Sequence, residues 1–547
     1  MSAPLVVVGI DGLPPSMLHR LVREGRTPVL GALIERGASG VLRSTPNYQS
    51  ASAWTSFATG VNPGKHGVFH FTNPVRGSYR FAQIDSRARH APTIWRMLSD
   101  AGARVAALNV PVSYPVEPLD GVMVAGWLCP SPSAEGFTHP PELAARLGDY
   151  PIHPDVRRHA RVGAYDVVAE TARGGISAKL DTACAVFQRE RPDVLCAVVT
   201  ETDSVQHWCW HLLDPDHPQH DAPLADRWRE DLLSVYASLD EALGRLLSVV
   251  GKDANVLIVS DHGQAPNSGG QVLLRPWLVH RGYLVPRSRT AGDRAADALV
   301  RSGFEAVRRH ASNRLKTWLR AHFPAVQGRA QVGVRGISPD WGRTRAWTEG
   351  GHIFVNTRGT WPEGCVDALK ERGRLISEIR DGLLELRDAD TGEQAIASVT
   401  VGEDEFAGPA SDLMPALLVH WRKDLPITRL VDSDGAIIER TDAPELPFGA
   451  HHPDGTLLTC GPSFRRTDRA YAHSIYDVAP TLLHLLRLPV PAYFDGRVMT
   501  DLMMTSAAKD VRGTAGNVPT GDVHARRSPV DDDEIVTERL RSLGYVE

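Results

Sequence analysis

Short runs of aliphatic and β-branched residues alternate along the chain with stretches whose apolar residues recur at helical spacing. Parallel strands need a crossover helix between them, so this alternation predicts an α/β fold with a mostly parallel sheet sandwiched by helices. The expected strands are Leu5–Ile10, Arg104–Asn109, Val122–Ala125, Val194–Thr200, Val256–Ser260, Leu417–His420 and Leu457–Cys460. The clearest expected helices are Thr93–Ala101, Arg227–Val250 and Ile475–Leu488.

The core pattern is interrupted twice. With 547 residues, the chain is too long for one compact core of about 150 residues. We expect a single α/β core assembled from residues 1–128, 191–275 and 448–503. Two segments, 129–190 and the cap-like 276–447, are expected as insertions, and 504–547 as a flexible tail with a short C-terminal helix.

Charge and hydropathy narrow the classes of partner. There are 60 Lys and Arg residues against 65 Asp and Glu, a formal net charge of −5, so no global positive field attracts a nucleic-acid polymer or an anionic membrane. No apolar run reaches the ~18–20 residues of a membrane span. The apolar N-terminal run meets Asp11 without a preceding basic segment, unlike a secretory signal. The sequence therefore predicts a soluble cytoplasmic protein and leaves its oligomeric state open.

Acidic residues stand at the ends of three expected strands. Asp11 follows Leu5–Ile10, Asp203 comes shortly after Val194–Thr200, and Asp261 follows Val256–Ser260. In an open α/β sheet the ligand site lies at the carboxyl ends of the strands, so we expect these acids to converge. An aspartate after a strand is also a common turn former or helix N-cap, and that alternative applies to each one alone.

Histidines accompany these acids. Asp203 and His207 are four residues apart, which places both on one face of a helix, and His262 directly follows Asp261. His451 lies in the tight-turn sequence Gly-Ala-His-His-Pro-Asp-Gly. Mixed aspartate and histidine sets suit zinc, manganese and similar ions, so the pattern indicates a metal site.

A hydroxyl nucleophile is expected near Ser50. The segment that follows it reads as a short helix closed by Gly60. A hydroxyl at the start of a helix lies beside free N–H groups and the positive end of the helix dipole, which suits a phosphate group. The alternative is that Ser50 or Ser52 only caps the helix.

Together these residues resemble the alkaline phosphatase superfamily, and within it the type I phosphodiesterase/nucleotide pyrophosphatase branch. The resemblance rests on five ordered motifs that span roughly half the chain. They are Val-Gly-Ile-Asp11-Gly, Ser50 through Trp54-Thr-Ser-Phe-Ala-Thr-Gly-Val-Asn-Pro-Gly-Lys-His66-Gly, Glu201-Thr-Asp203-Ser-Val-Gln-His207, Val-Ser-Asp261-His262-Gly and Gly449-Ala-His451-His-Pro-Asp-Gly.

The resemblance implies two divalent metal ions, zinc or else manganese, and a covalent phosphoserine intermediate. Asp11, Asp261 and His262 would hold the ion that activates the nucleophile, and Asp203, His207 and His451 would hold the second ion. Register counted back from Thr59-Gly60 makes Ser50 the nucleophile and a ligand of the first ion, where the branch usually has threonine. The implied activity is hydrolysis of a small-molecule phosphodiester or pyrophosphate.

Two positions depart from related patterns. The branch has an asparagine shortly after the His-Gly pair that helps to hold a phosphoryl oxygen; here the register gives Phe71, with Asn73 two residues further on. Sulfatases need Pro and Arg two and four residues after the nucleophile, where this chain has Ser52 and Trp54, so the sequence disfavours sulfate esters.

Several alternatives stay open at this point. A phosphomonoesterase, phosphonate hydrolase or phosphotransferase would use the same core motifs, because insertions build the substrate pocket. A catalytically idle member would use the body and its insertion as a binding or scaffold module. Arg-rich stretches at Arg287–Arg301 and Arg308–Arg320 either meet an anionic substrate or form a solvated helix face.

Overall fold

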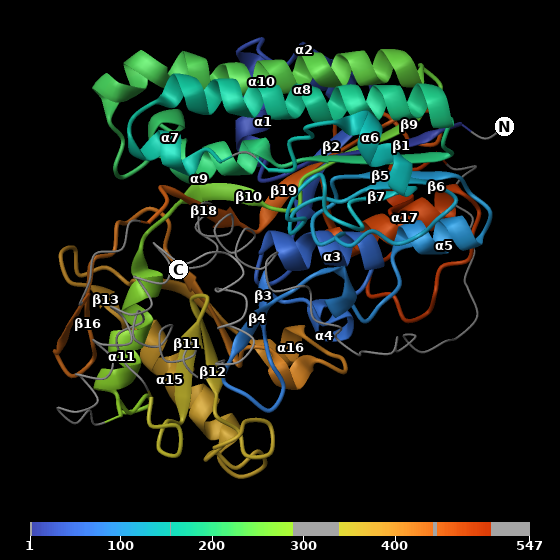
Figure 1. Cartoon of the computed structure of the whole chain (residues 1–547). Coiled ribbons are helices and arrows are strands. Elements are labelled where there is room, and N and C mark those ends of the chain that lie inside the picture. The colour runs from blue at the N-terminus through green and yellow to red at the C-terminus, as the bar shows by residue number, and fades with distance from the viewer. Residues whose placement is uncertain (1–2, 154, 288–338, 441–445, 505–547) are drawn as a thin grey trace, which may run out of the picture.

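A nine-stranded sheet forms the centre of the molecule in the computed structural model, which describes residues 3–153, 155–287, 339–440 and 446–504 (Figure 1). The strand order is β20-β2-β19-β9-β1-β8-β5-β6-β7. In chain order these strands are β1 Leu5–Ile10, β2 Ala38–Arg43, β5 Val105–Leu108, β6 Gly121–Val124, β7 Thr138–His139, β8 Val194–Val199, β9 Asn255–Val259, β19 Asp454–Cys460 and β20 Tyr471–Ser474. This architecture confirms the predicted fold class.

The middle of the sheet is parallel. β1 pairs in parallel with β8 on one side and with β9 on the other. β19 runs antiparallel to both of its neighbours, β9 and β2. The segment Leu457–Cys460 is therefore a strand, as the sequence predicts, but it departs from the parallel direction of the core.

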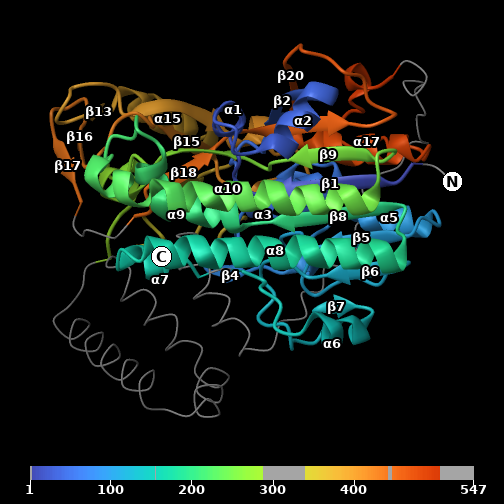
Figure 2. The same ribbon diagram turned by 90° about the horizontal axis from the view of Figure 1, so that it is seen from above.

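Helices cover both faces of the sheet. On one face lie α1 (Pro15–Arg23), α2 (Pro28–Arg36), α8 (Tyr165–Glu190) and α10 (Ala222–Val250), the last two side by side over the length of the sheet (Figure 2). On the other face lie α3 (Ser50–Thr59), α5 (Ile94–Asp100) and α17 (Val478–Leu485) (Figure 1). β1 supplies both cores because its side chains alternate: Val6 and Val8 pack under α8 and α10, whereas Leu5 and Val7 pack against α3 and α5.

A second body holds its own core and lies beside the carboxyl ends of the central strands (Figure 1). Its four-stranded sheet contains β11 (Ala346–Glu349), β12 (His352–Val355), β15 (Leu417–Trp421) and β14 (Ile396–Val401), all antiparallel. The predicted strand Leu417–His420 corresponds to β15 and so belongs to this sheet, outside the central one. Further elements here are α11 Leu274–His280, α15 Arg372–Glu385, α16 Gly402–Glu405, β13 Arg387–Asp388, β16 Arg429–Val431 and β17 Ile437–Glu439.

The remaining helices and strands are short. They are α4 Pro63–His66, β3 Thr72–Pro74, β4 Phe81–Gln83, α6 Ala144–Leu147, α7 Arg157–Arg161, α9 Glu201–Leu213, β10 Gly263–Pro266 and β18 Gly449–His452. Within the described ranges no helix has both the length and the hydropathy of a membrane span. The described residues include only Arg287 of the two Arg-rich stretches and only residue 504 of the C-terminal tail. The division of the chain into core and insertions stays a prediction.

Candidate active site

Three buried aspartates meet at the carboxyl edge of the central strands. Asp11 directly follows β1, Asp261 follows β9 after one residue, and Asp203 lies in the first turn of α9, which begins where β8 ends. All three residues are completely buried. They converge because β8, β1 and β9 are adjacent parallel strands whose carboxyl ends share one edge.

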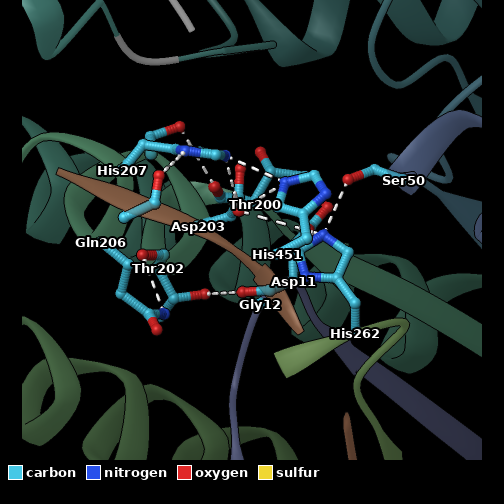
Figure 3. A network of polar contacts seen from close by, with 12 residues as sticks. Asp11, Gly12, Ser50, Thr200, Thr202, Asp203, Gln206, His207, His262 and His451 are labelled. Atoms are coloured by element: carbon cyan, nitrogen blue, oxygen red, sulfur yellow. Dashed lines mark hydrogen bonds and ion pairs between the residues drawn. The ribbon is translucent and has the colours of Figure 1, made fainter. Parts of the chain in front are cut away.

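Three histidines surround Asp203, and each is anchored in the same way (Figure 3). The Nδ1 atoms of His207, His262 and His451 lie 3.0, 2.9 and 2.8 Å from the carbonyl oxygens of Gly449, Gly263 and Tyr48. A carbonyl oxygen only accepts hydrogen bonds, so each Nδ1 carries the hydrogen and donates it. A neutral imidazole with its hydrogen on Nδ1 presents a lone pair at Nε2.

These Nε2 lone pairs meet at the carboxylate of Asp203. Its Oδ1 lies 3.3 Å from His207 Nε2, 3.6 Å from His451 Nε2 and 3.9 Å from His262 Nε2. The Nε2 atoms of His207 and His451 are only 3.0 Å apart. Burial lowers the pKa of His207 to about 4 and that of His262 to about 3. Both rings are therefore neutral at neutral pH, and their Nε2 atoms carry no hydrogen to donate to the Asp203 carboxylate.

The donor set fits a bound cation. Asp11 Oδ1 and Asp261 Oδ2 are buried and accept no hydrogen bond from an N–H group or hydroxyl of the described residues. Burial raises the pKa of both carboxyls well above its usual range, and the neighbouring carboxylates raise it further. A divalent cation between these groups would balance the negative charge of the aspartates and would accept the lone pairs of the histidine Nε2 atoms. Histidines that bind metals usually donate their other N–H to a carbonyl or carboxylate, as these three do.

The potential ligands form two groups that share one residue. Asp203, His207 and His451 make one group, and Asp11, Asp203 and His262 make the other. Within each group the ligand atoms lie within 4.8 Å of one another. Asp203 thus stands between the two groups, a placement that the sequence did not indicate.

Ser50 is the first residue of α3 and is completely buried. Its hydroxyl lies 2.9 Å from His262 Nε2 and donates to that nitrogen, because the His262 hydrogen is on Nδ1. The N-cap is Gln49, and its side chain makes no capping hydrogen bond. The hydroxyl of Ser50 therefore faces the imidazoles and does not cap the helix.

The other hydroxyls of α3 have different partners. Ser52 Oγ donates to Asn47 Oδ1 at 2.9 Å, Thr55 Oγ1 donates to the Ala51 carbonyl, and Ser56 Oγ lies 2.9 Å from His66 Nε2. Among the hydroxyls of this helix, that of Ser50 is the one bonded to a histidine of the cluster.

Both candidates for the branch's asparagine pack within their own surroundings. Asn73 Nδ2 donates to the Gly67 carbonyl at 2.6 Å, and its Oδ1 accepts the Phe69 N–H at 3.1 Å, so its amide stabilises its own loop. Phe71 is completely buried in an apolar cluster with Trp127. The role of holding a phosphoryl oxygen stays unassigned at both positions.

Trp54 orients Asp11 from the far side of the sheet. Its indole N–H donates to Asp11 Oδ2 at 3.0 Å, which leaves Oδ1 toward the histidines. The ring crosses β1 at Gly9, where a Cβ atom would lie 2.4 Å from the indole. Gly9 is therefore required for this contact, and no pattern in the sequence marks either residue for it.

A buried ion pair lies at the start of α9. Lys179 of α8 and Glu201, the first residue of α9, are 2.7 Å apart and at most 1% exposed. Lys179 also donates to Thr200 Oγ1 at 3.1 Å. The pair fixes the start of the helix that carries Asp203 and His207.

Lys179→Met is expected to destabilise the protein by about 3–5 kcal/mol, because it leaves the Glu201 carboxylate buried without its partner. Chemical unfolding followed by tryptophan fluorescence measures the shift. The double variant Lys179→Met/Glu201→Leu should recover much of the loss, since an apolar pair carries no buried charge. An unchanged midpoint for Lys179→Met would contradict the structural role of the pair.

A mostly parallel sheet that carries a buried carboxylate–imidazole cluster beside a serine defines the class: this is an alkaline-phosphatase-like α/β protein. A family model for type I phosphodiesterases/nucleotide pyrophosphatases matches residues 5–333, more than half of the 547 residues. The chain belongs to this family, which confirms the resemblance read from its motifs.

The following relative and structures share less than a quarter of their residues with this chain. An uncharacterised pyrophosphatase/phosphodiesterase of Schizosaccharomyces pombe is 23% identical over 286 residues, 51% of this chain and 47% of that protein. The chain thus spans about half the length of this curated relative. The structure of phosphonoacetate hydrolase from Sinorhizobium meliloti with phosphonoformate has a TM-score of 0.50 at 16% identity and covers 87% of this chain and 94% of its own. At this identity the likeness is one of fold.

Murine ectonucleotide pyrophosphatase/phosphodiesterase 5 is a further similar structure, with a TM-score of 0.49 and 13% identity. The match covers 92% of this chain and 100% of that one.

Proposed function

We propose that this protein is a metal-dependent hydrolase of small-molecule phosphodiesters or pyrophosphates that acts through a covalent phospho-Ser50 intermediate. Membership in the type I phosphodiesterase/nucleotide pyrophosphatase family supports phosphoester hydrolysis as the reaction. The proposed metal dependence and the proposed nucleophile rest on one observation. Three imidazoles with hydrogens fixed on Nδ1 direct their lone pairs to one carboxylate beside the Ser50 hydroxyl.

Two divalent ions would be held by seven residues. Asp11, Ser50, Asp261 and His262 would hold one ion, and Asp203, His207 and His451 the other. The separation of 2.9 Å between Ser50 Oγ and His262 Nε2 suits two ligands of one cation. Zinc, or alternatively manganese, fits this mixture of oxygen and nitrogen donors. Such ions act as Lewis acids, favouring loss of the hydroxyl proton and balancing charge on the phosphoryl oxygens and the leaving group.

The chain's own groups account for binding and displacement. Ser50 Oγ attacks phosphorus, the bond to the leaving oxygen breaks, and the alcohol departs with the proton that Ser50 loses. Water then attacks phosphorus and displaces Oγ, which takes up a proton from that water; this regenerates Ser50 and, from a diester, releases a phosphomonoester. Two in-line displacements give net retention at phosphorus. The first N–H groups of α3 and the positive end of its dipole stabilise the added phosphoryl charge.

The protein as isolated is expected to contain about two transition-metal ions per chain and to lose its activity on chelation. Elemental analysis and hydrolysis of bis-p-nitrophenyl phosphate, before and after exhaustive chelation, test this. Restored activity after zinc or manganese is added back identifies the ion. Full activity of a metal-free protein would contradict the proposal.

The same assay separates the alternatives. Faster turnover of p-nitrophenyl phosphate than of the diester would favour a monoesterase, and transfer of the phosphoryl group to an added alcohol would favour a phosphotransferase. p-Nitrophenyl sulfate should stay essentially uncleaved, because the sulfatase Pro and Arg positions hold Ser52 and Trp54. No hydrolysis with metal bound would favour the idle binding member. The cytoplasmic location stays a prediction.

A further inference from the structure

Tyr48 has an unusual backbone conformation for a bulky residue. Its φ angle is 34°, in the left-handed region, which residues with a Cβ atom rarely adopt. The residue lies in the connection between β2 and α3, two residues before Ser50. Its N–H donates to the Thr45 carbonyl at 2.8 Å, which closes a tight turn. A residue other than glycine keeps such a conformation only where its surroundings hold it, and such positions cluster at functional sites.

The carbonyl of Tyr48 is the acceptor that orients His451. His451 Nδ1 lies 2.8 Å from it, and this contact directs Nε2 into the cluster (Figure 3). The acceptors of the other two imidazoles, Gly263 and Gly449, belong to β10 and β18, which pair with each other. Tyr48 lies in neither a strand nor a helix. The direction of its carbonyl therefore depends on contacts other than those of a β ladder.

A histidine of the second body holds the side chain of Tyr48. The Tyr48 hydroxyl lies 2.6 Å from His420 Nδ1, and the centroids of the two rings are 5.3 Å apart. His420 belongs to β15, which has a neighbouring strand on either side. Its other ring nitrogen, Nε2, lies 3.3 Å from Thr400 Oγ1 of β14. The imidazole is thus held at both nitrogens, and it gives the phenol a fixed anchor.

Tyr48 therefore joins a strand of the second body to a proposed metal ligand. Its hydroxyl contacts His420, and its carbonyl contacts His451. Burial lowers the pKa of His420 to about 4 and raises the pKa of the Tyr48 phenol, so both groups are neutral at neutral pH. The contact between them acts on the site through geometry, since it adds no charge beside the proposed ligands.

We infer that Tyr48 is a positioning residue, and that the bond between its hydroxyl and His420 of the second body fixes the main-chain carbonyl that orients His451. The second body then helps to build the proposed ion site of Asp203, His207 and His451. The inference rests on the proposed function, since that ion site is the proposed one. Tyr48 acts through His451 and is not itself a proposed ligand.

Tyr48→Phe tests the inference, because it removes the hydroxyl and keeps the ring. Bound metal is removed by chelation, and the affinity for added zinc is measured by competition with a chromophoric chelator. We expect one of the two ions to bind about tenfold more weakly and the other to change less than about threefold, as for the loss of a contact that supports one metal ligand. Excess zinc should restore most of kcat for bis-p-nitrophenyl phosphate. A general loss of stability would instead weaken both ions alike.

Variants of His420 test the partner. His420→Phe should resemble Tyr48→Phe in its zinc affinities. His420→Asn should keep more of the affinity, because a side-chain amide can replace Nδ1 as the group that bonds to the phenol. The double variant Tyr48→Phe/His420→Phe should bind zinc no more weakly than either single variant, since both changes remove the same bond. The His420 variants also serve if Tyr48→Phe does not fold.

Tyr79→Phe is the matched control. Tyr79 lies between β3 and β4 and donates its hydroxyl to Asn356 Oδ1 of the second body at 2.8 Å. This variant also removes a tyrosine hydroxyl that contacts the second body, in this case through a residue outside the candidate site. Both zinc affinities should therefore stay within about threefold of the wild-type values.

The outcomes are distinct from those of the proposed function. Unchanged affinities for both ions in Tyr48→Phe and His420→Phe, or an equal loss in Tyr79→Phe, overturn the positioning role while the hydrolase stands. A wild type that binds two zinc ions and cleaves no phosphoester overturns the proposed function, and the affinities still decide the role of Tyr48. A wild type that binds no zinc overturns the proposed metal site and this inference with it.

Discussion

Ser50→Ala is expected to lower kcat for a phosphodiester by roughly three or more orders of magnitude, the usual cost of removing a covalent nucleophile. The Ser50 hydroxyl bonds to His262 Nε2, whereas the hydroxyls of Ser52, Thr55 and Ser56 have other partners. The remaining proposed ligands are unchanged, so the variant should retain its metal. Steady-state kinetics together with elemental analysis measure both properties.

Two further variants sharpen this result. Ser52→Ala should be milder, because Ser52 Oγ bonds to Asn47 and the Gln49 carbonyl, away from the histidines. Ser50→Thr should keep measurable activity, since the attacking oxygen remains and only a methyl group is added. Diester hydrolysis by Ser50→Ala at close to the wild-type rate would show that the register or the covalent mechanism is wrong.

Asp203→Ala is expected to reduce both metal content and activity more than the loss of any other single ligand. Asp203 belongs to both ligand groups, and its Oδ1 lies within 3.9 Å of all three Nε2 atoms. Without its charge, His207 and His451 face each other with no carboxylate between them, and Asp11 and Asp261 remain beside His262 alone. We expect fewer than about one tightly bound ion per chain after dialysis and a loss of activity of roughly three orders of magnitude.

The control for this variant is Asp253→Ala, which removes an exposed carboxylate that precedes β9, on the opposite edge of the sheet. It should keep wild-type metal content and kcat. Asp203→Asn, which keeps the shape of the side chain without its charge, should resemble Asp203→Ala. Two tightly bound ions in both Asp203 variants would refute the shared position of this carboxylate.

The sequence predicts the core strands well because their signal is local. Val194–Val199 and Asn255–Val259 are fully buried on both faces, so they appear as continuous apolar runs whose ends are shifted by one residue at most. Strand direction is a tertiary property. β19 is antiparallel to β9 and β2, and the chain enters it from the second body without a crossover helix. The residue types of β19 do not indicate this direction.

The convergence of the site residues follows from strand-end positions and ordered motifs, so the sequence could predict it. The supporting contacts could not be predicted. The partners of the three Nδ1 atoms are backbone carbonyls, which any residue provides. Lys179 belongs to none of the motifs in the sequence, yet it is buried against Glu201.

The anchoring of the three imidazoles by main-chain oxygens limits how this site can change during evolution. A side-chain partner can be deleted by one codon change, whereas every residue provides a main-chain carbonyl such as those of Tyr48, Gly263 and Gly449. The exceptions are substitutions at the two glycines themselves, where a Cβ atom would lie 2.2 Å from the Asp454 carbonyl oxygen at Gly263 and 2.4 Å from Gln264 Nε2 at Gly449. Most point mutations therefore leave the orientations of the three rings unchanged. Variation in the second body away from His420 can then change the surroundings of the site while the orientation of the three imidazoles is kept.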